Sequence, residues 1–239
     1  GSGKTTTLYS GLRHISDSSQ NILTVEDPIE YTLAGIGQTQ VNSKAGYDFA
    51  SGLRSILRQD PDIVMVGEIR DIETAKIAIQ ASLTGHLVLS TVHTNSAIGA
   101  IARLRDMGIE SYLLASSIRM VVSQRLVRRL CTKCRTKITA SDSMQQKFSL
   151  NSSSTVFQPT GCPECGHSGF KGRVALAECI SVTDELKALI HDEASESALE
   201  KCAFRNTLSI DASATKLLLE GVTSYEELLK VQSHQDANI

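Results

Sequence analysis

Two sets of side chains in this sequence have the types and spacing that chemistry requires, and the first set opens the chain. Residues 1–7 read Gly-Ser-Gly-Lys-Thr-Thr-Thr, the closing half of the pattern G-x-x-x-x-G-K-[ST]. In that pattern backbone N–H groups surround the α- and β-phosphates of a nucleotide, the lysine reaches the β- and γ-phosphates, and the next hydroxyl binds Mg²⁺. The pattern predicts that Lys4 and Thr5 hold ATP and Mg²⁺. Contacts with the nucleotide are also expected from Gly1, Ser2, Gly3 and Thr6.

The same pattern is incomplete at its beginning. Its first glycine, and the hydrophobic strand that normally delivers the loop, do not precede Gly1 in this sequence. We therefore expect the chain to be a C-terminal fragment of a longer protein.

Two acidic residues follow short apolar runs. Glu68 comes after Ile63-Val-Met-Val66 and Gly67, and Glu26 comes directly after Ile22-Leu-Thr-Val25. Ligand sites of open α/β sheets gather at the carboxyl ends of such strands. Mg²⁺ on a nucleotide usually takes a carboxylate ligand, directly or through water, which makes Glu68 the expected partner of Thr5. Glu26 is expected to polarise the attacking water, with the alternative that Glu26 and Asp27 only shape the turn before Pro28.

Two histidines bracket a third apolar run, His86-Leu-Val-Leu-Ser-Thr-Val-His93. If the whole run is a strand, the two side chains lie about 23 Å apart on opposite faces, and both cannot touch one phosphate. His93, at the carboxyl end, is expected to sense the γ-phosphate, although a lone histidine is more often structural. His86 is expected to bond to neighbouring backbone or to face another subunit.

The second set is made of cysteines. Two C-x₂-C pairs are separated by 27 residues, and they are Cys131, Cys134, Cys162 and Cys165. Four thiolates in this spacing suit a tetrahedral Zn²⁺. Disulfides are the alternative, which a reducing cytosol disfavours. Cys179 and Cys202 lack partners at ligand spacing and are expected to be small buried hydrophobes.

The elements that must position these residues alternate between apolar runs and helical patterns, as in an α/β domain with a largely parallel sheet. Asp48 and Asp71 occupy N-cap positions before two predicted helices. Further helices are expected after Lys4 and over Ile98 to Met107. Residues 31–41 resemble a hairpin, residues 125–129 the cationic last turn of a helix, and residues 232–239 a disordered end. We place domain boundaries so that 1–130 is the nucleotide-binding core, 131–170 the tetracysteine module and 171–239 a mixed, largely helical region.

Composition limits the partners of this chain. Its 239 residues carry a formal net charge of −2, which gives no broad basic field for nucleic acid, so no nucleic-acid partner is expected. No apolar run approaches the ~18 residues that cross a membrane, so direct membrane insertion is not expected. A cytoplasmic location fits both observations.

Four ordered motifs resemble the four boxes of secretion ATPases. They are residues 1–7, Thr24-Val-Glu-Asp-Pro-Ile-Glu-Tyr31, Arg58-Gln-Asp-Pro-Asp-Ile-Val-Met-Val-Gly-Glu-Ile-Arg-Asp71 and Thr84-Gly-His-Leu-Val-Leu-Ser-Thr-Val-His-Thr-Asn95. Together with the four cysteines and Arg173-Val-Ala-Leu-Ala-Glu178, they make nearly the whole chain resemble the C-terminal half of the type II secretion assembly ATPases. The sister family of type IV pilus extension ATPases is a more distant match, judged from stretches such as residues 100–109.

This resemblance implies a RecA-like P-loop fold without its first strand, a zinc module and a small helical C-terminal region. It further implies a homohexamer that hydrolyses ATP to drive pseudopilus assembly and protein export from the cytoplasmic side of an inner-membrane platform. Carried over by position, Lys4 and Thr5 are the Walker A residues, Glu68 the Walker B acid, Glu26 the Asp-box acid and His93 the His-box residue. The open alternatives are a pilus extension ATPase, a non-catalytic remnant that serves as an interaction subunit, and a RecA-like DNA motor.

Overall fold

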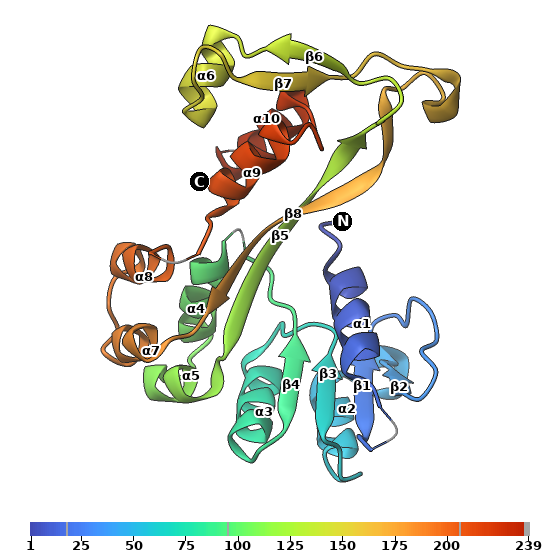
Figure 1. The fold of residues 1–239 in the computed structure, drawn as a ribbon. Helices are drawn as coiled ribbons and strands as arrows, with labels where there is room; N and C mark the ends of the chain where they lie inside the picture. The colour runs from blue at the N-terminus through green and yellow to red at the C-terminus, as the bar shows by residue number, and fades with distance from the viewer. Residues whose placement is uncertain (18, 95, 206, 237–239) are drawn as a thin grey trace. The chain divides into compact units, whose positions relative to one another are not determined.

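The computed structural model describes residues 1–17, 19–94, 96–205 and 207–236, and the chain divides into two compact units (Figure 1). The sheet unit contains Lys4–Val121 and Ile180–Arg205. The cysteine unit contains Gly1–Gly3, Val122–Cys179 and Asn206–Ile239. The last residue of the fourth motif, Asn95, lies outside the described residues.

The sheet unit is built on four parallel strands in the order β2-β1-β3-β4. Val25 of β1 pairs with Val66 of β3, and Val66 pairs with Ser90 of β4. Because all four strands run the same way, their carboxyl ends meet at one edge of the sheet. The strands are β1 (Ile22–Glu26), β2 (Gly37–Gln40), β3 (Ile63–Val66) and β4 (Leu87–Ser90).

Helices cover both faces of this sheet, and side chains that alternate along β3 pack against the helices of each face. Met65 points to the face where α1 (Lys4–Ile15) packs, together with Tyr9 and Leu12 of that helix. Val64 and Val66 point to the opposite face, in the core formed with α2 (Phe49–Ile56) and α3 (Ile72–Leu83). Four consecutive buried residues in β3 are typical of a strand covered on both sides. The predicted α/β architecture is confirmed.

The helix starts predicted from the sequence are confirmed by their caps. The Asp48 side chain accepts a hydrogen bond from Ser51 N at the start of α2, and Asp71 accepts one from Thr74 N at the start of α3. The predicted helix over Ile98 to Met107 is α4 (Ala97–Asp106), which begins after the cap Ser96. A short 3₁₀ turn, η1 (Ser43–Ala45), precedes α2.

Two strand predictions were wrong. Residues 31–41 contain only β2, which pairs with β1 in parallel, so they do not form a hairpin. The backbone before β2 bonds to side chains instead of to a second strand. Leu33 N donates to Gln38 Oε1 at 2.7 Å, and Glu30 N donates to the Tyr9 hydroxyl at 3.3 Å. The third apolar run is also shorter than predicted, because β4 ends at Ser90 and leaves His93 in the connection beyond it.

A cluster of helices completes the sheet unit. Its core joins α3 and α4 to α5 (Ser111–Ser117), α7 (Asp184–His191) and α8 (Glu196–Ala203). Cys202 is buried there, as expected, whereas Cys179 is exposed and the expectation of burial was wrong for it. Residues 180–205 thus pack with the sheet unit. The division at 130 and 170 remains a prediction about domains, because packing and independent folding are different properties.

The cysteine unit is smaller and partly β-structured. One two-stranded sheet pairs β5 with β8, and another pairs β6 with β7 in antiparallel fashion. Its core contains Val127 of β5, Leu176 of β8 and Leu218 of α9. The elements are β5 (Met120–Leu130), β6 (Thr136–Thr139), α6 (Asp142–Phe148), β7 (Thr155–Gln158), η2 (Pro163–Cys165), β8 (Phe170–Ser181), α9 (Ile210–Leu219) and α10 (Tyr225–Asp236).

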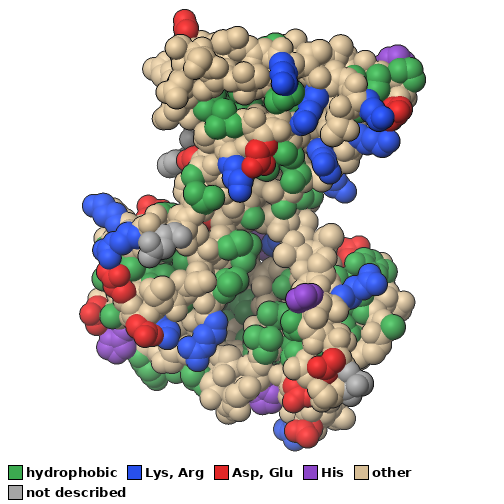
Figure 2. Space-filling view, viewed as in Figure 1, with side chains coloured by type: hydrophobic (Ala, Val, Ile, Leu, Met, Phe, Trp, Pro, Cys, Tyr) green, Lys and Arg blue, Asp and Glu red, His purple; other side chains and the backbone are tan. Residues whose placement is uncertain are grey.

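Residues 125–129 belong to β5, so the prediction of a helical last turn was wrong. Val127 and Leu130 are buried and the two arginines between them are exposed, with the guanidinium of Arg128 3.9 Å from the centre of the Phe170 ring. Figure 2 shows blue Lys and Arg side chains gathered on this unit in the upper part of the view. At the other end, α10 extends to Asp236 and residues 237–239 lie outside the described residues, so the disordered end predicted at 232–239 stays a prediction.

Candidate functional site

A cavity of about 180 Å³ lies at the carboxyl edge of the parallel sheet. Five of the residues singled out from the sequence line it, and they are Lys4, Thr5, Glu26, Glu68 and His93. Lys4 and Thr5 come from the first turn of α1, Glu26 from the end of β1, and Glu68 and His93 from the connections after β3 and β4. The structure therefore brings together, at one edge of the sheet, residues from four separate segments of the chain.

The remaining residues of the opening motif lie elsewhere. Thr6 is exposed on α1 and does not line the cavity. Gly1, Ser2 and Gly3 belong to the cysteine unit, in which the Gln124 amide donates to Ser2 O at 2.8 Å. Gly3 has φ +85°, a conformation that favours glycine, and a Cβ there would lie 2.8 Å from Gln124 Nε2. The role of these four residues in nucleotide binding stays a prediction.

Glu26 is almost fully buried, and both oxygens of its carboxylate have donors. Oε1 accepts hydrogen bonds from Thr24 Oγ1 at 2.6 Å and Gln38 Nε2 at 3.0 Å. Oε2 accepts one from the Tyr9 hydroxyl. Burial, reinforced by this bond and by the charge of Glu26, raises the pKa of Tyr9 to about 12. A buried tyrosine needs a partner for its hydroxyl, and Tyr9 was not singled out from the sequence, in which Glu26 is 17 residues away.

Glu68 is held between two basic side chains. Arg70 Nε donates to Glu68 Oε2 at 2.6 Å, and His93 Nε2 contacts Glu68 Oε1. Arg70 also lies 3.8 Å from the Asp27 carboxylate and 5.9 Å from the centre of the Phe49 ring. Arg70 was missed from the sequence, although its position two residues after Glu68 in an extended segment places both side chains on one side of the chain.

The cavity is rich in negative charge. Four carboxylates line it against one lysine, and they are Glu26, Asp27, Glu30 and Glu68. A polyphosphate alone would be repelled by these groups, whereas a divalent cation between phosphate and carboxylate would be attracted by both. The hydroxyl of Thr5 and the carboxylate of Glu68 are oxygen donors of the kind that Mg²⁺ prefers. The residues present therefore fit a nucleotide bound together with Mg²⁺.

His86 lies at the opposite end of β4 from this cavity. Its Nδ1 is 2.9 Å from Ala81 O and 3.1 Å from Thr84 Oγ1. These contacts fix the turn between α3 and β4. The expectation that His86 bonds to neighbouring backbone is confirmed.

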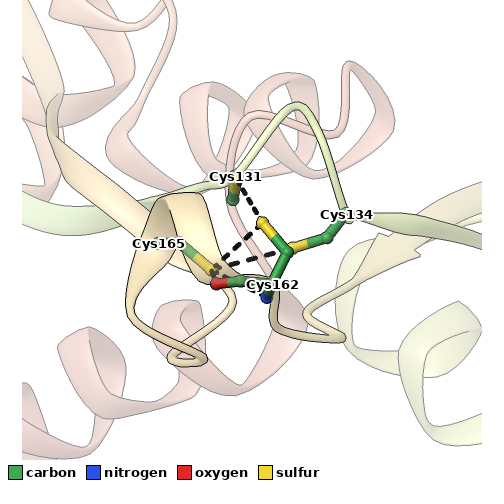
Figure 3. Close-up of side chains that lie close together, drawn as sticks. All are labelled: Cys131, Cys134, Cys162 and Cys165. Carbon is green, nitrogen blue, oxygen red and sulfur yellow. Dashed lines mark hydrogen bonds between the residues drawn. The ribbon is translucent and has the colours of Figure 1, made fainter.

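The four cysteines meet at the ends of two turns in the cysteine unit (Figure 3). The Sγ atoms of Cys131 and Cys162 are 3.9 Å apart, those of Cys134 and Cys165 are 3.9 Å apart, and those of Cys162 and Cys165 are 3.7 Å apart. Four sulfurs at about 2.3 Å from a tetrahedral Zn²⁺ lie about 3.8 Å from one another. The donor set and its spacing therefore fit zinc, and the free thiols do not form the alternative disulfides.

Backbone groups around the cluster favour the thiolate form of Cys165. Burial acts to raise the pKa of Cys165, but hydrogen bonds from the backbone N–H groups of Cys162 and Gly169 outweigh it and lower this pKa to about 6. Burial raises the pKa of Cys134 to about 11. Because zinc binds thiolates, N–H groups that stabilise a thiolate also favour the metal-bound form.

No helix among the described residues has both the length and the apolar character that a membrane crossing requires.

Comparison with known proteins gives the family of this chain. A family model described as "Type II/IV secretion system protein" matches residues 1–230. The chain is 53% identical over 233 residues to the "Type II secretion system ATPase E" of Vibrio cholerae, covering 97% of this chain and 46% of that protein. It is 53% identical over 235 residues to the "Putative type II secretion system protein E" of Escherichia coli, covering 98% of this chain and 48% of that protein. The chain thus spans about half the length of these relatives.

A solved structure supports the fold. The pilus retraction motor PilT, determined with bound ADP, matches this chain with a TM-score of 0.72 and 27% identity. The match covers 97% of this chain and 58% of the motor chain. The α/β core predicted from the sequence is therefore a fold that this chain shares with PilT.

Proposed function

We propose that this chain, which belongs to the type II/IV secretion system protein family, carries the ATP-hydrolysing site of a motor that drives pseudopilus assembly and protein export by a type II secretion system. The observation that carries the proposal is the single cavity that joins Lys4, Thr5, Glu26, Glu68 and His93. Its volume of about 180 Å³ is below the ~300–1,000 Å³ of complete small-molecule sites. The cavity suits the polyphosphate and metal end of ATP.

In this proposal Lys4 binds the phosphates of ATP and Glu68 binds the Mg²⁺ that accompanies them. Lys4 contacts the β- and γ-phosphates, and Thr5 and Glu68 hold Mg²⁺ directly or through water. Bound Mg²⁺ neutralises charge that develops on the phosphates. Arg70 keeps the Glu68 carboxylate in one orientation through its 2.6 Å hydrogen bond. His93 contacts Glu68 Oε1 and has 72% of its side chain exposed, and it is proposed to contact the γ-phosphate from the cavity.

Glu26 is proposed to orient the attacking water. Its two oxygens accept three hydrogen bonds, which leaves lone-pair capacity toward the cavity that it lines. A carboxylate fixed in this way accepts a proton from water without first reorienting.

Zinc is proposed to hold together the two turns at residues 131–134 and 162–165. The resemblance to secretion ATPases further supports a homohexamer that works at the cytoplasmic face of an inner-membrane platform, reaching the membrane through partner proteins. These partners are part of the proposal.

The central test is ATP hydrolysis by the protein as its own cells make it. Lys4→Ala should lower the rate of phosphate release at least 100-fold, because it removes a cation from the transferred phosphoryl group. Lys44→Ala is the matched control, since Lys44 is exposed on η1 and does not line the cavity. Turnover in Lys4→Ala equal to that of the control would exclude the proposed ATPase site.

A pilus motor, such as the pilus extension ATPase, is the second candidate, and the likeness to PilT, a retraction motor, favours a pilus motor in general. Deleting the gene separates the two functions. Loss of exoprotein export with intact pilus-dependent motility supports the secretion function, and the reverse result supports the pilus function.

A further inference from the structure

The Tyr9 hydroxyl is a junction between several segments of the sheet unit. It donates to Glu26 Oε2 and accepts from Glu30 N and Gln38 Nε2, each at 3.3 Å. The Tyr9 ring is fully buried and packs edge to face against Tyr31, with ring centres 4.8 Å apart. One hydroxyl thus links α1, the end of β1, the connection after Pro28 and β2.

The same helix carries the phosphate-binding residues. Tyr9 follows Thr5 by four positions in α1, so both side chains lie on one face of the helix. At 1.5 Å per residue, the two positions are separated by about 6 Å along the helix axis. A rigid turn of helix therefore connects the residue expected to bind the metal with the hydroxyl that bonds to Glu26.

The Glu26 carboxylate also accepts a hydrogen bond from a residue of its own strand. Thr24 precedes Glu26 by two positions in β1, which places both side chains on the same face of the sheet. Thr24 is 0% exposed. Its hydroxyl donates to Glu26 Oε1 at 2.6 Å. Tyr9 and Thr24 thus contact different oxygens, and two donors on opposite oxygens prevent rotation of the carboxylate.

From this geometry we propose that Tyr9 and Thr24 are positioning residues, which set the orientation in which Glu26 meets the attacking water. The inference rests on the proposed ATPase function and adds to it two residues that do not contact the substrate. Loss of either hydroxyl leaves the cavity and Lys4 intact. Binding of ATP should therefore persist while the chemical step becomes slower.

The first experiment measures steady-state ATP hydrolysis by Tyr9→Phe in the protein as its own cells make it. Loss of one hydrogen bond to a charged group should lower kcat by about 10- to 100-fold. KM for ATP should stay close to that of the unmodified protein, because the phosphate contacts are untouched. Tyr112→Phe is the matched control, since Tyr112 is 53% exposed on α5 and also loses one hydroxyl.

A second pair of variants keeps the test decisive if Tyr9→Phe does not fold. Thr24→Val keeps the shape of the side chain and removes the hydroxyl, whereas Thr24→Ser keeps the hydroxyl. Thr24→Val should show the same selective fall in kcat, and Thr24→Ser should restore most of the rate. Because loss of a buried hydrogen bond also lowers stability, the positioning role is identified by a fall in kcat at unchanged KM in protein that is folded.

The outcomes distinguish this inference from the proposed function. An unmodified protein without ATPase activity would contradict the proposed function itself. An active protein in which Tyr9→Phe or Thr24→Val keeps kcat within about 2-fold would overturn only the positioning role. Equal losses in Thr24→Ser and Thr24→Val, or a rise in KM that accounts for the whole effect, would overturn it as well.

Discussion

The ion pair between Arg128 of β5 and Glu227 of α10 should contribute measurably to the stability of the cysteine unit. Arg128 N and Nη2 donate to Glu227 Oε2 and Oε1 at 3.1 and 2.7 Å, and Lys230 Nζ donates to Glu227 Oε1 at 2.8 Å. The hydrogen bond from Arg128 is the largest cause that lowers the pKa of Glu227, from 4.5 to about 2. Only 8% of the Glu227 side chain is exposed but 48% of the Arg128 side chain is, so solvent screens part of the pair and the pKa shift sets an upper bound on its contribution.

These values set the expected size of the effect. A carboxyl group whose pKa falls from 4.5 to about 2 on folding stabilises the folded state by at most about 3 kcal/mol at neutral pH. Because the folded pKa is lowered, this contribution is present above pH 4.5 and is lost as the pH falls towards 2. Glu227→Gln imitates the protonated side chain and should remove most of it at pH 7.

Hydrogen exchange measured by mass spectrometry at pH 7 tests this expectation. Amides of β5 and α10 should exchange about 100-fold faster in Glu227→Gln if they exchange through opening of the cysteine unit. Glu226→Gln removes an equal charge from the exposed neighbouring position and should leave exchange unchanged. The reasoning is refuted if both variants exchange alike, or if Glu227→Gln differs from the unmodified protein as much at pH 2 as at pH 7.

Three further predictions concern the metal, the cavity and a helix cap. Cys165→Ser should lower bound zinc from about one per chain to a small fraction, because it removes one of four ligands; full zinc content by elemental analysis would contradict the assignment. His93→Gln should lower kcat for ATP about 100-fold without changing the thermal midpoint, since the side chain is largely exposed, and unchanged turnover would remove His93 from the mechanism. Asp71→Ala should lower the free energy of unfolding by about 1 kcal/mol, because it removes the cap of α3. The thermal midpoint should fall in this variant and stay unchanged in Asp106→Ala, which alters the exposed last residue of α4.

Much of the sheet unit could be predicted from local signals. Asp48 and Asp71 cap helices where the sequence places them, because an N-cap depends only on hydrogen bonds within one turn. The apolar run Ile63–Val66 is a strand buried on both faces, as its length and composition predict. The cysteine spacing predicted the cluster for the same reason, since each C-x₂-C pair is a local turn.

Other elements were mispredicted because their state depends on distant partners. Residues 31–41 were predicted as a hairpin, but Leu33 N bonds to the Gln38 side chain and β2 pairs with β1 in parallel. Residues 125–129 have the charge pattern of a helix end, but β5 is held as a strand by pairing with β8. In both cases the pairing strand, β1 or β8, lies outside the segment whose pattern was interpreted.

The sequence by itself determined which side chains can do chemistry, since Lys4 is identified by its glycine-rich motif, and Glu26, Glu68 and His93 by residue type and by position after apolar runs. Only the tertiary structure decided how each of them is held. Arg70 orients Glu68, and Tyr9 and Thr24 orient Glu26, through hydrogen bonds of one defined geometry. The physical reason is range. A strand end or a turn is set by neighbouring residues, whereas the direction of a buried carboxylate is set by whichever donors the packed fold brings within about 3 Å of it.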